Sequence, residues 1–197
     1  MNYSTPPIKY KPSKITVIGD SGVGKSALIS QFLNRVIDPN TQPTIGNISA
    51  NTKLDDGTDT LNVVIWDTAG QERFKSMTDL FFREARGCVI VFDLTDYSTF
   101  IGTQNWYERI CKNSVSPPVC VLVGNKKDLS HKEVNTDQAL KQAALFNALY
   151  FEVSALTGEG VKDAFYSFLG RIEPEVDQKV EVVVGQPTNE KKEKKCC

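Results

Sequence analysis

Short apolar runs alternate with longer segments of helical period along most of the chain. The apolar runs have the length of strands, and most are apolar throughout, as expected for strands buried on both faces of a sheet. We predict strands at Ile15–Ile18, Leu61–Trp66, Cys88–Leu94, Val119–Val123 and Tyr150–Val153. We predict helices at Lys25–Asn34, Met77–Ala85, Ser98–Lys112, Thr136–Leu149 and Gly160–Arg171. This alternation indicates a mostly parallel sheet with helices on both faces.

One pair of strands departs from the parallel pattern. The segment Ile48–Leu54 precedes the strand Leu61–Trp66, and the turn-forming cluster Asp55-Asp-Gly57 lies between them. This arrangement predicts a hairpin. The predicted fold class is therefore α/β, with a mostly parallel six-stranded sheet, one antiparallel edge and helices on both faces. Ligands of such sheets bind at the carboxyl ends of the strands, so the loops there are the candidate sites.

Changes in composition mark the edges of the predicted domain. The first eleven residues are followed at once by Pro12 and contain Pro6 and Pro7, which is typical of an extended segment. We predict a flexible arm at residues 1–11 and a single domain at residues 12–173. Residues 174–197 carry too little apolar surface to offset the entropy cost of ordering, so we predict a disordered tail there.

Composition and charge argue against several classes of function. The chain has 197 residues and a formal net charge of −1, which argues against electrostatic binding to nucleic acid. Its longest apolar stretches, Cys88–Phe92 and Pro117–Val123, are far shorter than the ~18 to 20 residues of a membrane-spanning helix. Met1–Tyr10 lacks the apolar core of a secretory signal. Five cysteines, with an adjacent pair at 196 and 197, do not suit a disulfide framework, so we expect a reducing, cytosolic setting.

The first loop at a strand end is typical of phosphate binding. Gly19-Asp-Ser-Gly-Val-Gly-Lys-Ser26 fits the P-loop pattern G-x-x-x-x-G-K-[ST], between a predicted strand and a predicted helix. Successive backbone N–H groups of such a loop surround a phosphate, Lys25 reaches the terminal phosphates, and the Ser26 hydroxyl can bind Mg²⁺. The residues predicted to contact the phosphates are Ser21, Gly22, Val23, Gly24, Lys25, Ser26 and Ala27.

Two later stretches predict what is done with the phosphates. Asp67 lies at a strand end, where its carboxylate can hold Mg²⁺ through a water. Gly70 has no side chain, so its N–H can approach a γ-phosphate, and Gln71 has an amide that can orient an attacking water. Thr44, in Pro43-Thr-Ile-Gly46, gains a functional interpretation from its placement with these residues.

The loop after Val119–Val123 predicts which base is bound. In Gly124-Asn-Lys-Lys-Asp128, the Asp128 carboxylate can accept hydrogen bonds from N1–H and the exocyclic amine of guanine, whereas adenine leaves it unpaired. Lys126 can lie along the base plane, and Asn125 can bridge the base and the phosphate loop. Ala155 can offer its N–H to the guanine carbonyl. The residues predicted at the base are Asn125, Lys126, Asp128, Ser154, Ala155 and Leu156.

Together these motifs resemble the Rab family of small GTPases within the Ras superfamily, over about Lys11–Arg171. The resemblance implies the P-loop NTPase G-domain fold. The motifs are Gly19-Asp-Ser-Gly-Val-Gly-Lys-Ser26, Ile65-Trp-Asp-Thr-Ala-Gly-Gln-Glu-Arg-Phe74, Arg73-Phe-Lys-Ser-Met-Thr78, Phe81-Phe-Arg-Glu-Ala85, Ile90-Val-Phe-Asp-Leu-Thr95 and Cys196-Cys197. The metal ligands implied are Ser26, Thr44 and Asp67, and the catalytic residues implied are Gln71, Lys25 and Gly70.

The resemblance also implies a biological role. It implies a switch between GTP and GDP in vesicle trafficking, with slow hydrolysis until an activating protein assists. The implied partners are an exchange factor, an activating protein, effectors, a prenylation escort and a GDP-dissociation inhibitor, and no nucleic acid. Geranylgeranyl groups on Cys196 and Cys197 would hold the protein on the cytoplasmic face of intracellular membranes, because two lipids anchor where one binds only reversibly.

The chain departs from the family pattern at two places. Ile37 stands where the family carries an aromatic residue against the guanine edge, which predicts weaker retention of nucleotide. Ser49 stands where an aromatic residue would share a surface patch with Trp66 and Phe81, so effector choice is open.

Two other functions remain open beside the regulated switch. One is a GTP-binding scaffold that hydrolyses too slowly to cycle, which Gln71 argues against and Ile37 leaves open. The other is a P-loop kinase for a small metabolite, which needs an arginine-rich lid and does not account for Asp128 or the terminal cysteines.

Overall fold

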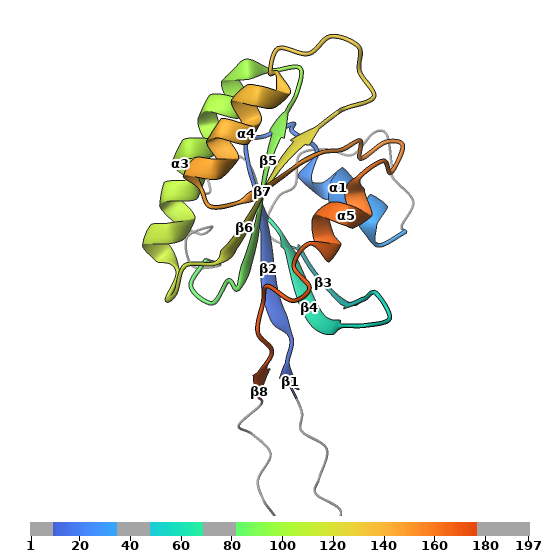
Figure 1. Ribbon diagram of the computed structural model, residues 1–197, viewed down its shortest axis with the longest axis vertical. Helices are drawn as coiled ribbons and strands as arrows, with labels where there is room; N and C mark the ends of the chain where they lie inside the picture. The colour runs from blue at the N-terminus through green and yellow to red at the C-terminus, as the bar shows by residue number, and fades with distance from the viewer. Residues whose placement is uncertain (1–9, 35–47, 69–81, 177–197) are drawn as a thin grey trace, which may run out of the picture.

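The fold is known from a computed structural model that describes residues 10–34, 48–68 and 82–176. Within those residues six strands form one sheet in the order β3-β4-β2-β5-β6-β7 (Figure 1). Their bounds are β2 Ser13–Ile18, β3 Ile48–Asp55, β4 Thr60–Asp67, β5 Gly87–Asp93, β6 Val119–Asn125 and β7 Leu149–Glu152. Neighbouring strands are parallel except β3 and β4, which are antiparallel. The predicted sheet and its antiparallel edge are confirmed.

Helices cover both faces of the sheet, as predicted. Their bounds are α1 Lys25–Phe32, α3 Tyr97–Asn113, α4 Thr136–Leu145 and α5 Val161–Tyr166. In Figure 1, α1 and α5 lie on one face and α3 and α4 on the other. Side chains fix two of the helix starts: Asp96 accepts from Ser98 N at 3.0 Å, and Asn135 forms a capping box with Gln138.

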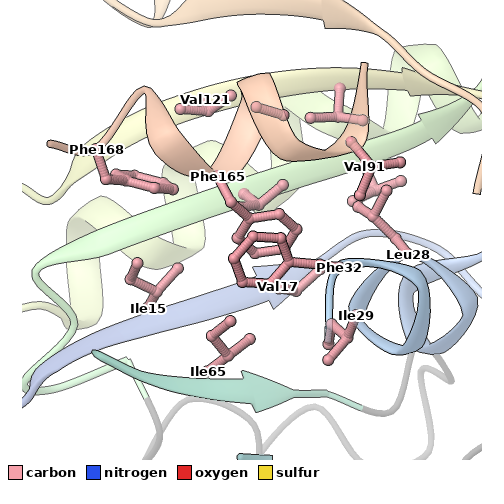
Figure 2. Close-up of a cluster of buried hydrophobic side chains, with 14 of the residues drawn as sticks. Ile15, Val17, Leu28, Ile29, Phe32, Ile65, Val91, Val121, Phe165 and Phe168 are labelled. Carbon is pink, nitrogen blue, oxygen red and sulfur yellow. The ribbon is translucent and has the colours of Figure 1, made fainter. Parts of the chain in front are cut away.

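Two buried clusters lie on the opposite faces of the sheet, and strand parity assigns residues to them. Val89 and Val91 of β5 belong to the cluster under α1 and α5, whereas Ile90 and Phe92 belong to the cluster under α3 and α4. Figure 2 shows the first cluster, in which Phe32 of α1 and Phe165 of α5 stack with ring centroids 4.2 Å apart. Burial on both faces accounts for the continuously apolar strands.

Three helices end earlier than their apolar pattern predicts, α1 by the smallest margin, at Phe32 where Asn34 was predicted. The other two end further from their predicted bounds. The predicted helix to Leu149 stops at Leu145, because Asn147 takes a left-handed φ of 50° and the Ala148 N–H donates to Ala143 O at 2.9 Å. The predicted helix to Arg171 stops at Tyr166, and tighter turns follow until Gly170, with φ 66°. Of the predicted helix 77–85 the structure describes only the last four residues, and 82–84 form a turn.

A second, two-stranded sheet joins segments far apart in sequence. β1 (Tyr10–Lys11) pairs antiparallel with β8 (Glu175–Val176), at the lower end of Figure 1. Lys11 Nζ lies 3.3 Å from Glu175 Oε1. These strands flank the predicted domain bounds 12 and 173, which stay a prediction. Within the described ranges no helix is both long enough and apolar enough to span a bilayer.

Candidate functional site

Every described residue predicted for the site lies at the carboxyl edge of the large sheet or at the start of α1. The loop after β2 leads into α1, and the loop after β5 leads into α3 on the other face. The chain therefore leaves neighbouring strands β2 and β5 in opposite directions, which is the arrangement that opens a ligand site in this class of sheet.

Lys25 is held at the centre of the phosphate loop. Its Nζ donates to the carbonyl oxygens of Gly19 at 3.0 Å and Asp20 at 2.7 Å, and the residue is 6% exposed. Burial lowers the pKa of Lys25 to about 8, because desolvation disfavours the ammonium ion, while Asp67 and Asp20 offset part of this effect. An incoming phosphate would supply the negative charge that this buried ammonium favours.

Gly24 is required where the phosphate loop (Gly19–Ser26) meets the base segment, Gly124–Asp128. Its φ is 92°, and a Cβ on this residue would lie 2.4 Å from Asn125 Nδ2. Gly22 also has a positive φ of 80°, but a Cβ there would meet nothing within 4 Å. The two glycines of one loop thus have different reasons to be glycine: backbone conformation alone at Gly22, and conformation with close approach at Gly24.

Ser26 and Asp67 meet beside Lys25. The Ser26 hydroxyl donates to Asp67 Oδ2 at 2.5 Å, and Asp67 is buried at the end of β4. The next residue holds this strand end in place, because the Thr68 hydroxyl donates to Val17 O at 2.7 Å. A hydroxyl and a carboxylate at one point are hard oxygen ligands, which is the donor set that suits Mg²⁺.

Asn125 connects the base segment to the phosphate loop. Its Nδ2 donates to Val23 O at 2.8 Å, and its Oδ1 accepts from the Ala155 N–H at 3.0 Å. The residue is buried at the end of β6. The Ala155 N–H, predicted for the guanine carbonyl, therefore already has a partner within the protein. One amide side chain joins three segments that are distant in sequence.

The remaining base residues form a second group of contacts. The Ser154 hydroxyl donates to Asp128 Oδ1 at 2.5 Å and accepts from Thr157 N at 3.1 Å. Leu156 is 74% exposed. Lys126 takes a left-handed φ of 65°. The structure thus brings Asn125, Asp128 and Ser154 together through Asn125–Ala155 and Asp128–Ser154 contacts, and it leaves Leu156 facing solvent.

Sequence reasoning missed two side chains that belong to this site. Lys126 Nζ pairs with Asp93 Oδ2 at 2.5 Å, although Asp93 entered the sequence analysis only as part of a motif. Trp106 Nε1 donates to Asp20 Oδ1 at 2.8 Å, which ties α3 to the phosphate loop. Strand register was the signal available for Asp93, because it is the β5 partner of Asn125. No comparable signal pointed to Trp106.

Several predicted residues lie outside the described part of the chain. They are Ile37, Thr44, Gly70, Gln71, Cys196 and Cys197. Their roles stay predictions.

Comparison with known proteins agrees with this geometry. A model described as "Ras family" matches residues 14–174. The chain belongs to the Ras family. It is a small GTPase, a hydrolase of GTP, and membership implies that it binds guanine nucleotide and is regulated by exchange factors, activating proteins and effectors in general.

Similar curated proteins of this family carry Rab names. Ras-related protein RABA6b from Arabidopsis thaliana is 39% identical over 168 residues, which cover 85% of this chain and 73% of that protein. Ras-related protein Rab-27B from Bos taurus is 37% identical over 180 residues, covering 85% and 83%. Ras-related protein Rab-18-B from Danio rerio is 40% identical over 164 residues, covering 81% and 78%. The resemblance to Rab proteins is confirmed at this level of identity.

Proposed function

We propose that the protein is a GTP/GDP switch of intracellular vesicle trafficking. In this role it binds GTP with Mg²⁺, recruits effectors in that state, and hydrolyses GTP slowly unless an activating protein assists. Similarity to proteins with Rab names supports trafficking over the other roles of Ras-family proteins.

One observation carries the proposal that the site acts on guanine nucleotides. Asn125 contacts the phosphate loop through Val23 O and the base segment through the Ala155 N–H. A phosphate loop of this kind serves many nucleotides, but here Asn125 joins it to the segment that carries Asp128, which supports a single site for base and triphosphate. The Asp128 carboxylate complements the two donors on the guanine edge.

The roles we propose for individual residues follow from their chemistry. Ser26, Thr44 and Asp67 hold Mg²⁺, which when bound neutralises charge on the phosphates. The residues that contact the phosphates are Ser21, Gly22, Val23, Gly24, Lys25, Ser26, Ala27 and Gly70. Gln71 orients the attacking water, and Lys25 stabilises the charge that develops on the phosphates. Asn125, Lys126, Asp128, Ser154, Ala155 and Leu156 line the base.

We also propose an attachment to membranes. Cys196 and Cys197 accept geranylgeranyl groups delivered by a prenylation escort, and a GDP-dissociation inhibitor returns the protein to the cytosol. The protein is then cytosolic or peripheral on the cytoplasmic face. In cells, replacing both cysteines by Ser releases the protein from the membrane fraction, whereas replacing Cys111, an exposed thiol on α3, leaves its distribution unchanged. Membrane binding without Cys196 and Cys197 contradicts the attachment.

The nucleotide site is tested on the purified full chain. We expect about one GDP per chain after purification, slow release of a fluorescent GDP with Mg²⁺, and faster release with a chelator. Asp128→Asn weakens GDP binding about 100-fold or more and favours xanthosine diphosphate, because the new amide can donate to the extra carbonyl of the xanthine base.

A matched control uses another acidic residue. Asp137→Asn changes an exposed carboxylate in the first turn of α4 and leaves both affinities as they were. A chain that binds ADP as well as GDP, or an Asp128→Asn variant with unchanged preference, contradicts the assignment of the base site.

A further inference from the structure

Asp93 is a buried carboxylate that the proposed roles do not use. It is the last residue of β5, its side chain is 8% exposed, and its Oδ2 lies 2.5 Å from Lys126 Nζ. In the sheet its partner on β6 is Asn125, the residue before Lys126. The contact therefore follows from the register of two parallel strands, at the point where the base segment begins.

The two oxygens of this carboxylate have separate partners. Oδ1 accepts from the Thr95 N–H at 2.8 Å and from the Thr95 hydroxyl at 2.7 Å, and Oδ2 pairs with Lys126. Burial raises the pKa of Asp93, but the bonds from Lys126 and Thr95 outweigh burial and leave the pKa below its ordinary value. Asp93 is therefore charged at neutral pH. The two bonds from Thr95, in the turn directly after β5, fix the orientation of its carboxylate.

Lys126, the partner of Asp93, is partly exposed where Asp93 is buried. Its side chain is 36% exposed, so part of it faces solvent, while its ammonium group is held against a buried partner. A free lysine stem samples many rotamers, and holding its tip removes most of that freedom before any ligand arrives. The left-handed φ of Lys126 (65°) turns the chain sharply directly after β6, and the Leu129 N–H closes a turn on Lys126 O at 3.0 Å.

We propose that Asp93 is a positioning residue that anchors Lys126, so that the lysine stem forms a preformed platform for the face of the bound base. This inference rests on the guanine site of the proposed function and adds a residue to it. Asp93 acts on the plane of the base through Lys126, whereas Asp128 acts on the base edge. The two carboxylates therefore have separable effects on nucleotide release.

The test measures release of fluorescent GDP and IDP from the full chain. Asp93→Asn keeps an oxygen for Thr95 but places an amide N–H₂ against the Lys126 ammonium. We expect release about tenfold faster for GDP and by the same factor for IDP, which lacks the exocyclic amine but offers the same ring face. Asp96→Asn is the matched control, because Asn caps a helix as well as Asp, and it leaves release unchanged.

A double-mutant cycle separates positioning from general support of the fold. Lys126→Met keeps an apolar stem and removes the ammonium. If Asp93 acts through Lys126, adding Asp93→Asn to Lys126→Met causes no further acceleration. Equal acceleration in both backgrounds means that Asp93 acts through the Thr95 turn, and it overturns the proposal. Unchanged release from Asp93→Asn overturns it as well.

Failure of the proposed function would look different. A wild-type chain that holds no guanine nucleotide contradicts the guanine site itself, and this inference with it. A wild-type chain that retains GDP, with Asp93→Asn releasing it at the same rate, contradicts only the role of Asp93. Thermal unfolding of each variant shows whether the fold is intact.

Discussion

The phosphate end and the base end of the site are built in different ways. At the phosphate end, Lys25 bonds to carbonyl oxygens five and six positions earlier in the chain, so the loop closes on itself. At the base end, the hydrogen bonds join residues 26 to 102 positions apart, and each of them involves at least one side chain. Lys25 is thus held locally in sequence, although Ser26 and Asp20 of the same loop bond to the distant residues Asp67 and Trp106, whereas the base end depends on the register of the sheet.

This difference shows where each end is vulnerable. A local loop keeps its shape as long as its own backbone conformation is available, so its glycines matter most. The base end keeps its shape only while β5, β6 and the segment after β7 stay aligned, so its buried polar side chains matter most. Gly24 and Asn125 are the point where both kinds of construction meet.

The largest expected effect comes from breaking that meeting point. Gly24→Ala places a Cβ 2.4 Å from Asn125 Nδ2 and forces the two loops apart. We expect GDP affinity to fall more than about 100-fold, because the Asn125–Val23 bond is lost and a positive φ is strained. Calorimetric titration with GDP measures the change.

Gly22→Ala serves as the matched control within the same loop. It has a similar positive φ but meets nothing within 4 Å, so only backbone strain of about 1 kcal/mol is added. The expected loss in GDP affinity is about fivefold. Equal losses for the two variants would contradict the view that the contact between loops is what matters at Gly24.

A pH effect of intermediate size sharpens the contrast, because burial lowers the pKa of Lys25 at the phosphate end. The pKa of Lys25 is about 8 in the nucleotide-free protein and about 10.4 in an unfolded chain. Phosphates favour the ammonium form, so binding takes up a proton above pH 8. We expect GDP affinity to fall by up to about tenfold per pH unit between pH 8 and 10.

The same shift affects folding with the opposite sign. Between pH 8 and about 10.4 the unfolded chain binds more protons at Lys25 than the folded chain, so nucleotide-free stability contributed by this residue rises with pH. Titration calorimetry in two buffers of different ionisation heat counts the protons. Lys127→Met removes a surface ammonium and keeps the slope. A GDP affinity that does not change from pH 8 to 10 contradicts the assignment to Lys25.

The smallest expected effect concerns the hydrogen bond between α3 and the phosphate loop. Trp106→Phe removes the indole N–H that donates to Asp20 Oδ1 at 2.8 Å. Since Asp20 O also holds Lys25, we expect GDP release about three- to fivefold faster. Trp66→Phe keeps an aromatic ring under Lys14 and leaves the rate unchanged. Equal rates for wild type and Trp106→Phe would limit the indole to packing.

Much of the fold could be predicted because burial on both faces leaves a direct trace in the sequence. The strands of the large sheet begin and end within two residues of the predicted bounds, since most of them are continuous apolar runs. The predicted ends of α4 and α5 were wrong, because the apolar spacing continues past Asn147 and Gly170, where the backbone takes a left-handed conformation. Apolar pattern records which face is buried, and it does not record where a backbone changes conformation.

The site, like the fold, had features that the sequence predicted and features that it did not. The residues at strand ends could be found one by one, because each loop carries a motif whose chemistry is local. Their mutual bonds could not, because Asp93–Lys126 depends on strand register and Trp106–Asp20 on how α3 packs. Asp93 was part of the motif Ile90–Thr95, but the motif alone gave it no role. The role follows from its strand partner Asn125, which places Lys126 beside the carboxylate.

The pairing of β1 with β8 has a consequence for how the chain could be rewired. Tyr10 lies opposite Val176, so a linker of a few residues could join these positions covalently. New ends could then be opened at the exposed hairpin turn near Gly57, which lies at the end of the β3–β4 hairpin away from Asp67. Such a circular permutant would keep the order of strands within the sheet while changing their order along the chain.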